Sequence, residues 1–193
     1  MNTVNTENRS SIRKRRGALG GAHPTARELG IRECKLATTE SLVFSPDTRR
    51  FCEQNVCGQL GKTWACPPAV GSYTDCVKIC KSFKSMMVFS TVTDLKGRYN
   101  PQGWHEARIA HERATAVIAE EFRRDRSDCL VLSTEGCEVC ERCTYPEGPC
   151  VDPEHCYPSV EGYGILVMDV VKKLGMKYHY GGESLTYFSF ILF

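Results

Sequence analysis

The chain has 193 residues, twelve cysteines and a formal net charge of +2. This length is enough to bury a core in one domain, so the cysteines are not needed as the disulfide staples of a small secreted scaffold. The sequence has no apolar run of about eighteen residues and no apolar leader segment, so it predicts neither a membrane span nor secretion. We therefore expect a cytoplasmic protein whose thiols bind metal rather than pair with one another.

The N-terminal segment, residues 1–24, is predicted to be a disordered basic tail. Residues 1–33 carry seven Lys or Arg against three Glu, whereas the rest of the chain is slightly acidic. The basic run at residues 13–16 could contact nucleic acid, but the polar residues around it favour a solvated tail. We expect no nucleic-acid binding, and we predict that residues 25–193 form one metal-binding domain.

The remaining chain alternates between apolar runs that predict strands and periodic segments that predict helices. We expect strands at residues 36–44, 86–92, 130–132 and 185–193, and helices at residues 73–83, 102–126 and 160–174. This order favours a single α/β domain, with a central mixed or mostly parallel sheet and flanking helices. Cysteine-rich loops follow the first and third strands. If these strands are parallel, both loops lie at one edge of the sheet.

The more informative cysteine group consists of Cys137, Cys140 and Cys143, each two residues from the next, followed by Cys150. This spacing puts three thiolates on one tight loop. It suits a cubane iron–sulfur cluster, which presents several metal corners close together. A structural zinc ion usually takes two cysteines from one knuckle and two ligands from elsewhere. The spacing therefore favours a [4Fe–4S] cluster, with zinc as the alternative.

The earlier group lies in a glycine- and proline-rich run that predicts a ligand loop, and its members are Cys52, Cys57, Cys66 and Cys76. Cys80 lies one helical turn beyond Cys76 and competes with it as the fourth ligand. The irregular gaps leave a structural zinc site open. The two groups could form two adjacent clusters, or one site that draws ligands from both loops.

The remaining cysteines and two histidines give weaker evidence of metal binding. We predict that Cys34 and Cys129 are buried thiols, because each borders an apolar strand. Cys156 could ligate the second site or only lie beside it. His105 and His111 are interpreted as surface or hydrogen-bonded histidines rather than ligands.

Several of these motifs occur together in a known family. The chain resembles domain of unknown function 2284, a family of predicted metal-binding proteins that is common in anaerobes. The matching runs are Cys52-x4-Cys57-Gly58, Trp64-Ala65-Cys66-Pro67-Pro68, Gly136-Cys137-x2-Cys140-x2-Cys143-x-Tyr145-Pro146, Pro149-Cys150, Pro158-Ser159-Val160-Glu161-x-Tyr163-Gly164 and Ile191-Leu192-Phe193. Leu60 stands where members usually carry Tyr. The resemblance covers the chain from about residue 30 and implies metal binding, but no reaction.

Three functions fit these observations. The first is an iron–sulfur protein, with one or two clusters, that carries electrons or serves a redox partner protein as an accessory subunit. The second is a redox enzyme whose cluster faces a small-molecule or corrinoid pocket. The third is a zinc-stabilised binding module. Neither a phosphate-binding glycine loop nor a nucleophile motif is present, so the sequence assigns no catalytic residue and leaves open whether the protein is an enzyme.

Overall fold

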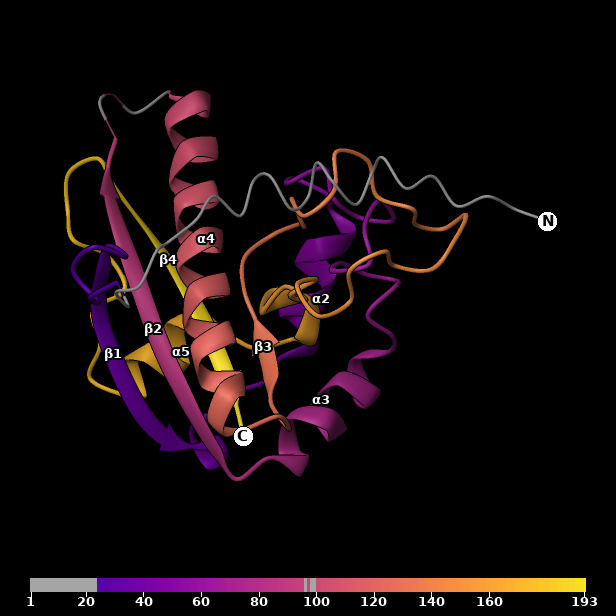
Figure 1. Ribbon diagram of the computed structural model, residues 1–193, viewed down its shortest axis with the longest axis horizontal. Coiled ribbons are helices and arrows are strands. Elements are labelled where there is room, and N and C mark those ends of the chain that lie inside the picture. The colour runs from indigo at the N-terminus through magenta and orange to yellow at the C-terminus, as the bar shows by residue number, and fades with distance from the viewer. Residues whose placement is uncertain (1–23, 96, 98–99) are drawn as a thin grey trace.

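The computed structural model describes residues 24–95, 97 and 100–193, and it arranges them as a sheet with helices on both faces (Figure 1). The strands are β1 (Ile31–Thr38), β2 (Ser85–Asp94), β3 (Leu130–Leu132) and β4 (Ser184–Leu192). The helices are α2 (Pro46–Glu53), α3 (Tyr73–Ser82), α4 (Pro101–Asp125) and α5 (Val167–Lys173), with short 3-10 helices η1 (Thr39–Ser41) and η2 (Glu161–Tyr163). The predicted tail lies outside the described residues, except for Pro24.

The sheet has the order β1-β2-β4-β3, and every neighbouring pair of strands is antiparallel. The prediction of a mixed or mostly parallel sheet is therefore wrong, although a domain built from helices and strands is compatible with the structure. The reason lies in the last strand. β2 and β3 run in the same direction, as expected of two strands joined by a helix, but β4 inserts between them and pairs with both. Apolar periodicity identifies strands and carries no information about which strands become neighbours.

The long helix α4 covers one face of the sheet (Figure 1). Its start is fixed by Asn100, whose side-chain oxygen accepts a hydrogen bond from the Gly103 backbone N–H at 2.9 Å, and by Pro101 in the first turn. Ala119 of this helix packs against the sheet residues Phe89 and Ile191. The small alanine side chain lets the helix approach the strands closely.

The opposite face of the sheet packs against α3, α5 and η2. Val88 and Phe190 are directly paired across β2 and β4, and both are fully buried on this face. They belong to one apolar cluster with Val170 and Val171 of α5. Burying a side chain of this size stabilises the fold by about 1.5–3 kcal/mol, so the two apolar clusters on the two faces hold the layers together.

The strands β2, β3 and β4 and the helices α3 and α4 lie close to their predicted ranges. β1 spans residues 31–38 rather than the predicted 36–44, and two segments near the cysteines also differ. The helix expected over residues 160–174 is interrupted. The short η2 ends at Tyr163, its C-cap Gly164 has φ 76°, and α5 begins only at Val167. A Cβ atom at Gly164 would lie 2.4 Å from the Tyr73 ring, so only glycine fits at this close approach. The second difference is α2, which the sequence did not predict and which carries Cys52. Within the described residues, no helix is both long and apolar enough to cross a bilayer.

Candidate metal centre

The chain reaches the first cysteine group by turning back after β1. β1 and β3 run in opposite directions, so their carboxyl ends lie at opposite ends of the sheet. Residues 39–45 return along the domain, where Phe44 forms a bridge with Ile165 and the Ser45 backbone N–H donates to the Gly164 carbonyl at 2.9 Å. The Ser45 side chain then caps α2 by accepting from the Asp47 backbone N–H. Cys52 lies in the last turn of this helix.

The segment after α2 folds back so that Cys57 and Cys66 approach Cys52. Asn55 has φ 52°, and its side chain accepts a hydrogen bond from the Leu60 backbone N–H at 3.0 Å. The Gly61 N–H then donates to the Pro67 carbonyl at 2.9 Å, which closes the loop. Burial raises the pKa of Cys52 to about 11, and nearby Glu161, Cys66 and Cys57 contribute to the rise. A bound cation would offset this crowding of negative charge, because a metal site requires thiolates.

Cys66 is the innermost thiol of this group, and polar groups from two other segments surround it. It is 3% exposed, and burial raises its pKa. The Gly136 backbone and the Ser159 side chain lie near its sulfur and favour the thiolate, which offsets part of this rise. The buried Thr63 hydroxyl lies close enough to act in the same way, yet it has no hydrogen bond of good geometry with the described residues. An unsatisfied donor beside a thiol fits a site that gains negative charge when metal binds.

The second group is a loop that begins at Gly136, which has φ 79°, and folds its cysteines toward one another. The Gly148 N–H donates to the Thr144 carbonyl at 2.9 Å, and the Thr144 hydroxyl donates to the Pro149 carbonyl at 2.7 Å. These bonds return the chain so that Cys150 approaches the earlier cysteines. Burial raises the pKa of Cys140 to about 11, and the neighbouring thiols that add to the rise are Cys137, Cys150 and Cys143.

Cys156 joins the second group from outside the compact run. Its thiol lies close enough to those of Cys137 and Cys150 for them to raise its pKa. The same proximity lowers the pKa of Cys137. The second loop therefore gathers five thiols, one more than the compact run and Cys150 supply.

The two cysteine groups lie side by side. Trp64, two residues before Cys66, packs edge-on against Tyr145 of the second loop, with ring centroids 5.0 Å apart. The Trp64 Nε1–H donates to the Gly148 carbonyl at 3.2 Å. Gly136 packs so closely on the Gln59 side chain that a Cβ atom there would lie 3.2 Å from it. We expected this adjacency from parallel strands, and it arises instead from direct packing of the loops.

A short segment between the groups ties them to the sheet. The Ser159 N–H donates to the Ala65 carbonyl at 2.9 Å, beside Cys66. On its other side, Ser159 pairs with Ser133, the residue after β3, in a parallel bridge. The Ser133 N–H donates to the Pro158 carbonyl, and the Val160 N–H donates to the Ser133 carbonyl, both at 2.9 Å. This arrangement fixes the first loop relative to the start of the second.

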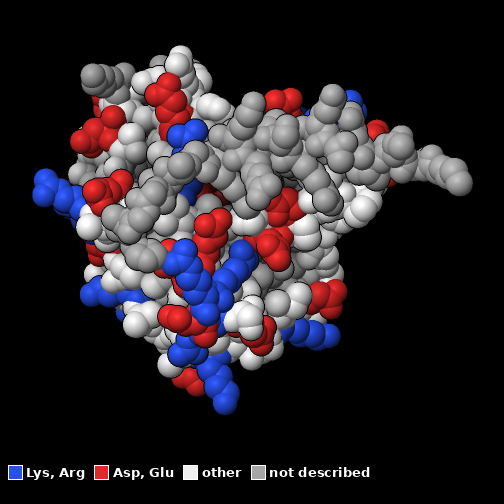
Figure 2. All heavy atoms as spheres, viewed as in Figure 1, with Lys and Arg blue, Asp and Glu red and all other residues white. Residues whose placement is uncertain are grey.

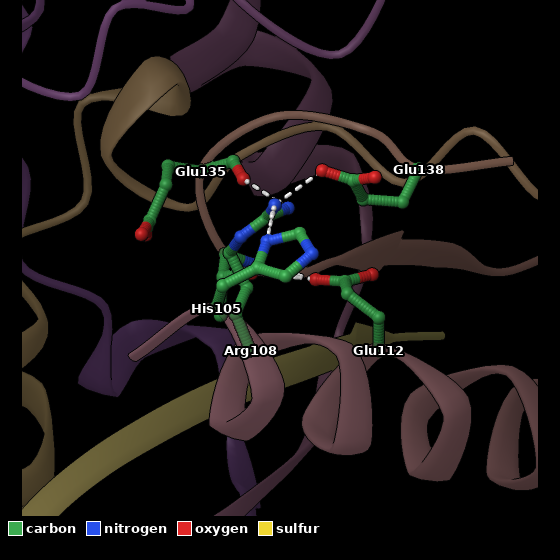
Figure 3. A network of polar contacts seen from close by, with 6 residues as sticks. His105, Arg108, Glu112, Glu135 and Glu138 are labelled. Atoms are coloured by element: carbon green, nitrogen blue, oxygen red, sulfur yellow. Dashed lines mark hydrogen bonds and ion pairs between the residues drawn. The ribbon is translucent and has the colours of Figure 1, made fainter. Parts of the chain in front are cut away.

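A polar network on α4 supports the second loop from below (Figure 3). The Arg108 guanidinium pairs with the Glu138 carboxylate and lies 3.3 Å from His105 Nδ1. It also donates to the Glu135 backbone carbonyl at 3.4 Å. One turn further along α4, the Glu112 carboxylate accepts from the Thr134 hydroxyl at 2.6 Å and from the Ser133 hydroxyl at 2.7 Å. The residues on either side of Cys137 are thereby bound to α4.

Cys76 and Cys80, the two competing fourth ligands of the first group, lie elsewhere. Both are 0% exposed on α3, within the apolar cluster that contains Tyr163. The Cys76 thiol donates to the Val70 carbonyl at 3.3 Å and lies 3.9 Å from the Arg49 guanidinium. The structure thus brings together three of the four cysteines that the sequence assigned to the first site and all four assigned to the second.

The other cysteines and histidines have simpler surroundings. Cys129 is half-buried against the apolar cluster under α4, whereas Cys34 is exposed, so the prediction of a buried Cys34 is wrong. Cys34 lies on the edge strand β1, where only one neighbouring strand covers the chain. His111 is fully buried and hydrogen-bonded to Thr91 and Ser189, as a satisfied core histidine. Sequence reasoning missed the roles of Arg108 and Glu112, whose only signal was their place on the polar side of a helix.

A family comparison agrees with these cysteine-rich loops. Residues 35–193 match the model of a family described as predicted metal-binding protein, domain of unknown function 2284 (DUF2284). The chain belongs to this DUF2284 family. The matched range includes every cysteine of both groups. No curated protein and no solved structure matches the chain.

The donor set of the DUF2284 site consists of thiols. Soft thiolate ligands select zinc, copper(I) or iron–sulfur clusters over magnesium, calcium or manganese. Within residues 24–95, 97 and 100–193, no three Cys, His, Asp or Glu side chains are gathered tightly enough to enclose a single ion. The cysteines of each group are neighbours on loops that meet, and their chemistry fits a thiolate-ligated centre.

Proposed function

We propose that this DUF2284 protein is an iron–sulfur protein of the [4Fe–4S] type that transfers electrons or serves a redox partner as an accessory protein. The observation that carries the proposal is the meeting of two thiol groups, three cysteines from one loop and five from the other. Three of the five lie within seven residues, a density that suits the corners of a cubane better than a zinc tetrahedron.

The contact between the loops supports electron transfer in particular. Bound iron–sulfur clusters supply one-electron chemistry, and their potentials depend on hydrogen bonds to sulfur and on exposure. The protein residues here provide both influences, since polar groups of Gly136 and Ser159 lie near the Cys66 sulfur and favour its thiolate, and Cys57 is exposed. An inner thiol and an exposed thiol in one group would place a centre between the partner's surface and the second group.

The charge of the second loop indicates what kind of partner would dock there. Residues 135–154 contain six acidic residues and one basic residue, Arg142. By contrast, acidic and basic side chains are interspersed over much of the face shown in Figure 2. We expect the redox partner to present a basic face to this loop, and its association to weaken as salt is added.

Anaerobic purification with metal and sulfide analysis tests the proposal. We expect brown protein that contains iron and acid-labile sulfide in similar amounts, and a reduced protein with the electron paramagnetic resonance of a cluster. Colourless protein with stoichiometric zinc and no sulfide would overturn the proposal and favour a zinc-stabilised binding module.

One observation favours a second candidate, a redox enzyme. The first group brings only three thiols together, because Cys76 lies in the core. A three-thiolate centre leaves one metal position for a small molecule. Adding candidate small ligands to the reduced protein distinguishes the two functions. Unchanged spectra favour electron transfer, whereas a spectral shift on ligand addition favours the enzyme.

A further inference from the structure

We infer that Cys156 is a ligand of the second centre, and that Cys76 is a core thiol that ligates neither centre. This inference rests on the proposed metal centre and specifies which cysteines build it. The sequence alone left Cys76, Cys80 and Cys156 as competing candidates. The surroundings of each thiol in the structure distinguish them.

The first observation is the position of the Cys156 thiol. The thiols of Cys137 and Cys150, which come from opposite ends of the second loop, both lie close enough to influence it. Cys156 therefore lies between the start and the end of the ligand run rather than at its margin. A thiol near both ends of the run is in reach of the same centre as the other cysteines of the loop.

The second observation is that α4 holds the segment around Cys156 at three points, and a local pair within the segment adds a fourth contact. His155 pairs with Asp152 at 2.7 Å and with Glu120 of α4 at 3.4 Å. Arg123 of α4 donates to the Glu154 backbone carbonyl at 2.7 Å and lies over the Tyr157 ring, 5.7 Å from its centroid. The residues on both sides of Cys156 are thus anchored to the longest helix. Ligands that are fixed before metal binds lose little conformational freedom when it arrives.

The third observation concerns Cys76, whose thiol already has partners. It donates to the Val70 carbonyl, and α3 buries it completely among apolar side chains. Its neighbour Arg49 hydrogen-bonds the carbonyls of Gly71 and Gly162, which holds the surrounding backbone in place. Moving Cys76 to the first group would require breaking these contacts. A buried cysteine with such surroundings behaves as a small apolar residue.

The number of available ligands agrees with counting Cys156 as a ligand and leaving Cys76 out. The first group has three thiols and the second has five when Cys156 is included, so the eight match the number that two four-iron clusters take. In two-cluster ferredoxins, one cysteine of a run ligates the other cluster. Gly136 packs on Gln59 and lies near Cys66, so Cys137, the first cysteine of the second loop, is close to the group that lacks one ligand.

Thiol labelling of the anaerobic wild-type protein tests the inference, with and without an iron chelator, followed by peptide mass spectrometry. Cys34 is exposed and serves as the free-thiol reference, and Cys76 serves as the buried reference. We expect Cys34 to react in both samples, and Cys156 to react at least tenfold faster after chelation. Labelling of Cys156 in the metal-bound protein at a rate unaffected by the chelator would overturn the inference.

Paired variants provide a second readout that does not depend on labelling. We expect Cys156→Ala to lose iron and sulfide and to alter the paramagnetic spectrum, while Cys76→Ala retains the wild-type values in whatever fraction folds. Wild-type iron, sulfide and spectrum in Cys156→Ala would overturn the inference, as would selective iron loss in folded Cys76→Ala. Failure of the proposed function is distinguishable, because the wild-type protein itself would then contain no iron or sulfide.

Discussion

The Gly136 backbone lies beside the Cys66 thiol and favours its thiolate, although the two residues are 70 positions apart in the sequence. Gly136 directly precedes Cys137, so this one contact joins the innermost thiol of the first group to the start of the second. Amide groups that point toward sulfur stabilise the thiolate. A change in the charge of one centre would therefore alter the electrostatic environment of the cysteines in the other.

The first prediction concerns the packing that holds this junction. Trp64→Phe removes the hydrogen bond to the Gly148 carbonyl but keeps a ring against Tyr145. We expect a loss of about 1 kcal/mol in the stability of the loop contact, and roughly fivefold faster iron release to a chelator. Trp104→Phe, on the exposed side of α4, is the matched control and should release iron at the wild-type rate. Equal rates in all three proteins would show that this contact does not hold the second loop.

The second prediction separates a ligand from a core cysteine. Cys140→Ala should remove the second centre and leave the fold around the first partly intact, because Cys140 lies near three other thiols of its group. Cys129→Ala should keep the full metal content, since this residue packs against apolar side chains under α4. Iron and sulfide per chain are the measurement. Iron loss in Cys129→Ala together with full retention in Cys140→Ala would reverse the two assignments.

Local signals in the sequence were sufficient for the elements with strong patterns. The apolar run of β2 and the repeating alanines of α4 predicted these elements to within about two residues. α2 was missed because it spans only eight residues, among glycines and prolines that favour a loop. Its signal was the Ser45-Pro46-Asp47 start, in which Ser45 caps the helix and Pro46 occupies the first turn.

The sheet and the outer cysteines depended on contacts that no local pattern records. The sequence pattern does not determine which strands pair. In the structure β4 inserts between β2 and β3, so the prediction of a mixed or mostly parallel sheet was wrong. The compact spacing of Cys137, Cys140 and Cys143 was itself enough to predict that they lie together. The position of Cys156 is set by Arg123 and other residues of α4, far away in sequence, so spacing alone left its role open.

The third prediction concerns the support beneath the second loop. Arg108→Gln removes the ion pair with Glu138 and leaves the carboxylate of Glu112 without a nearby cation. Because Glu138 is 41% exposed, we expect a loss of about 1–3 kcal/mol in unfolding free energy, less than for a fully buried pair. Arg124→Gln removes an exposed pair with Glu121 on the same helix and should change stability by less than about 0.5 kcal/mol. Denaturant unfolding of both variants under anaerobic conditions is the measurement, and equal losses in the two would contradict a special role for Arg108.

The fourth prediction concerns pH and the buried His111. Burial lowers the pKa of His111 to about 3, while its Nδ1 lies 2.8 Å from the Thr91 hydroxyl and its Nε2 lies 2.8 Å from the Ser189 hydroxyl. The unfolded chain takes up a proton near pH 6.5, whereas the folded chain does not, so the stability from a neutral His111 is complete above pH 6.5 and is lost as the pH falls toward 3. Between pH 6.5 and pH 5 the loss should be about 2 kcal/mol.

His111→Gln isolates this contribution, because the variant keeps every cysteine and carboxylate and therefore keeps the pH dependence that they cause. We expect the variant to be less stable than the wild type at pH 7, since glutamine cannot reproduce both hydrogen bonds, and the difference to shrink by about 2 kcal/mol at pH 5. Unfolding free energies of the two proteins at both pH values are the measurement. A stability difference that stays constant between pH 7 and pH 5 would show that His111 takes up its proton equally in the folded and unfolded chains.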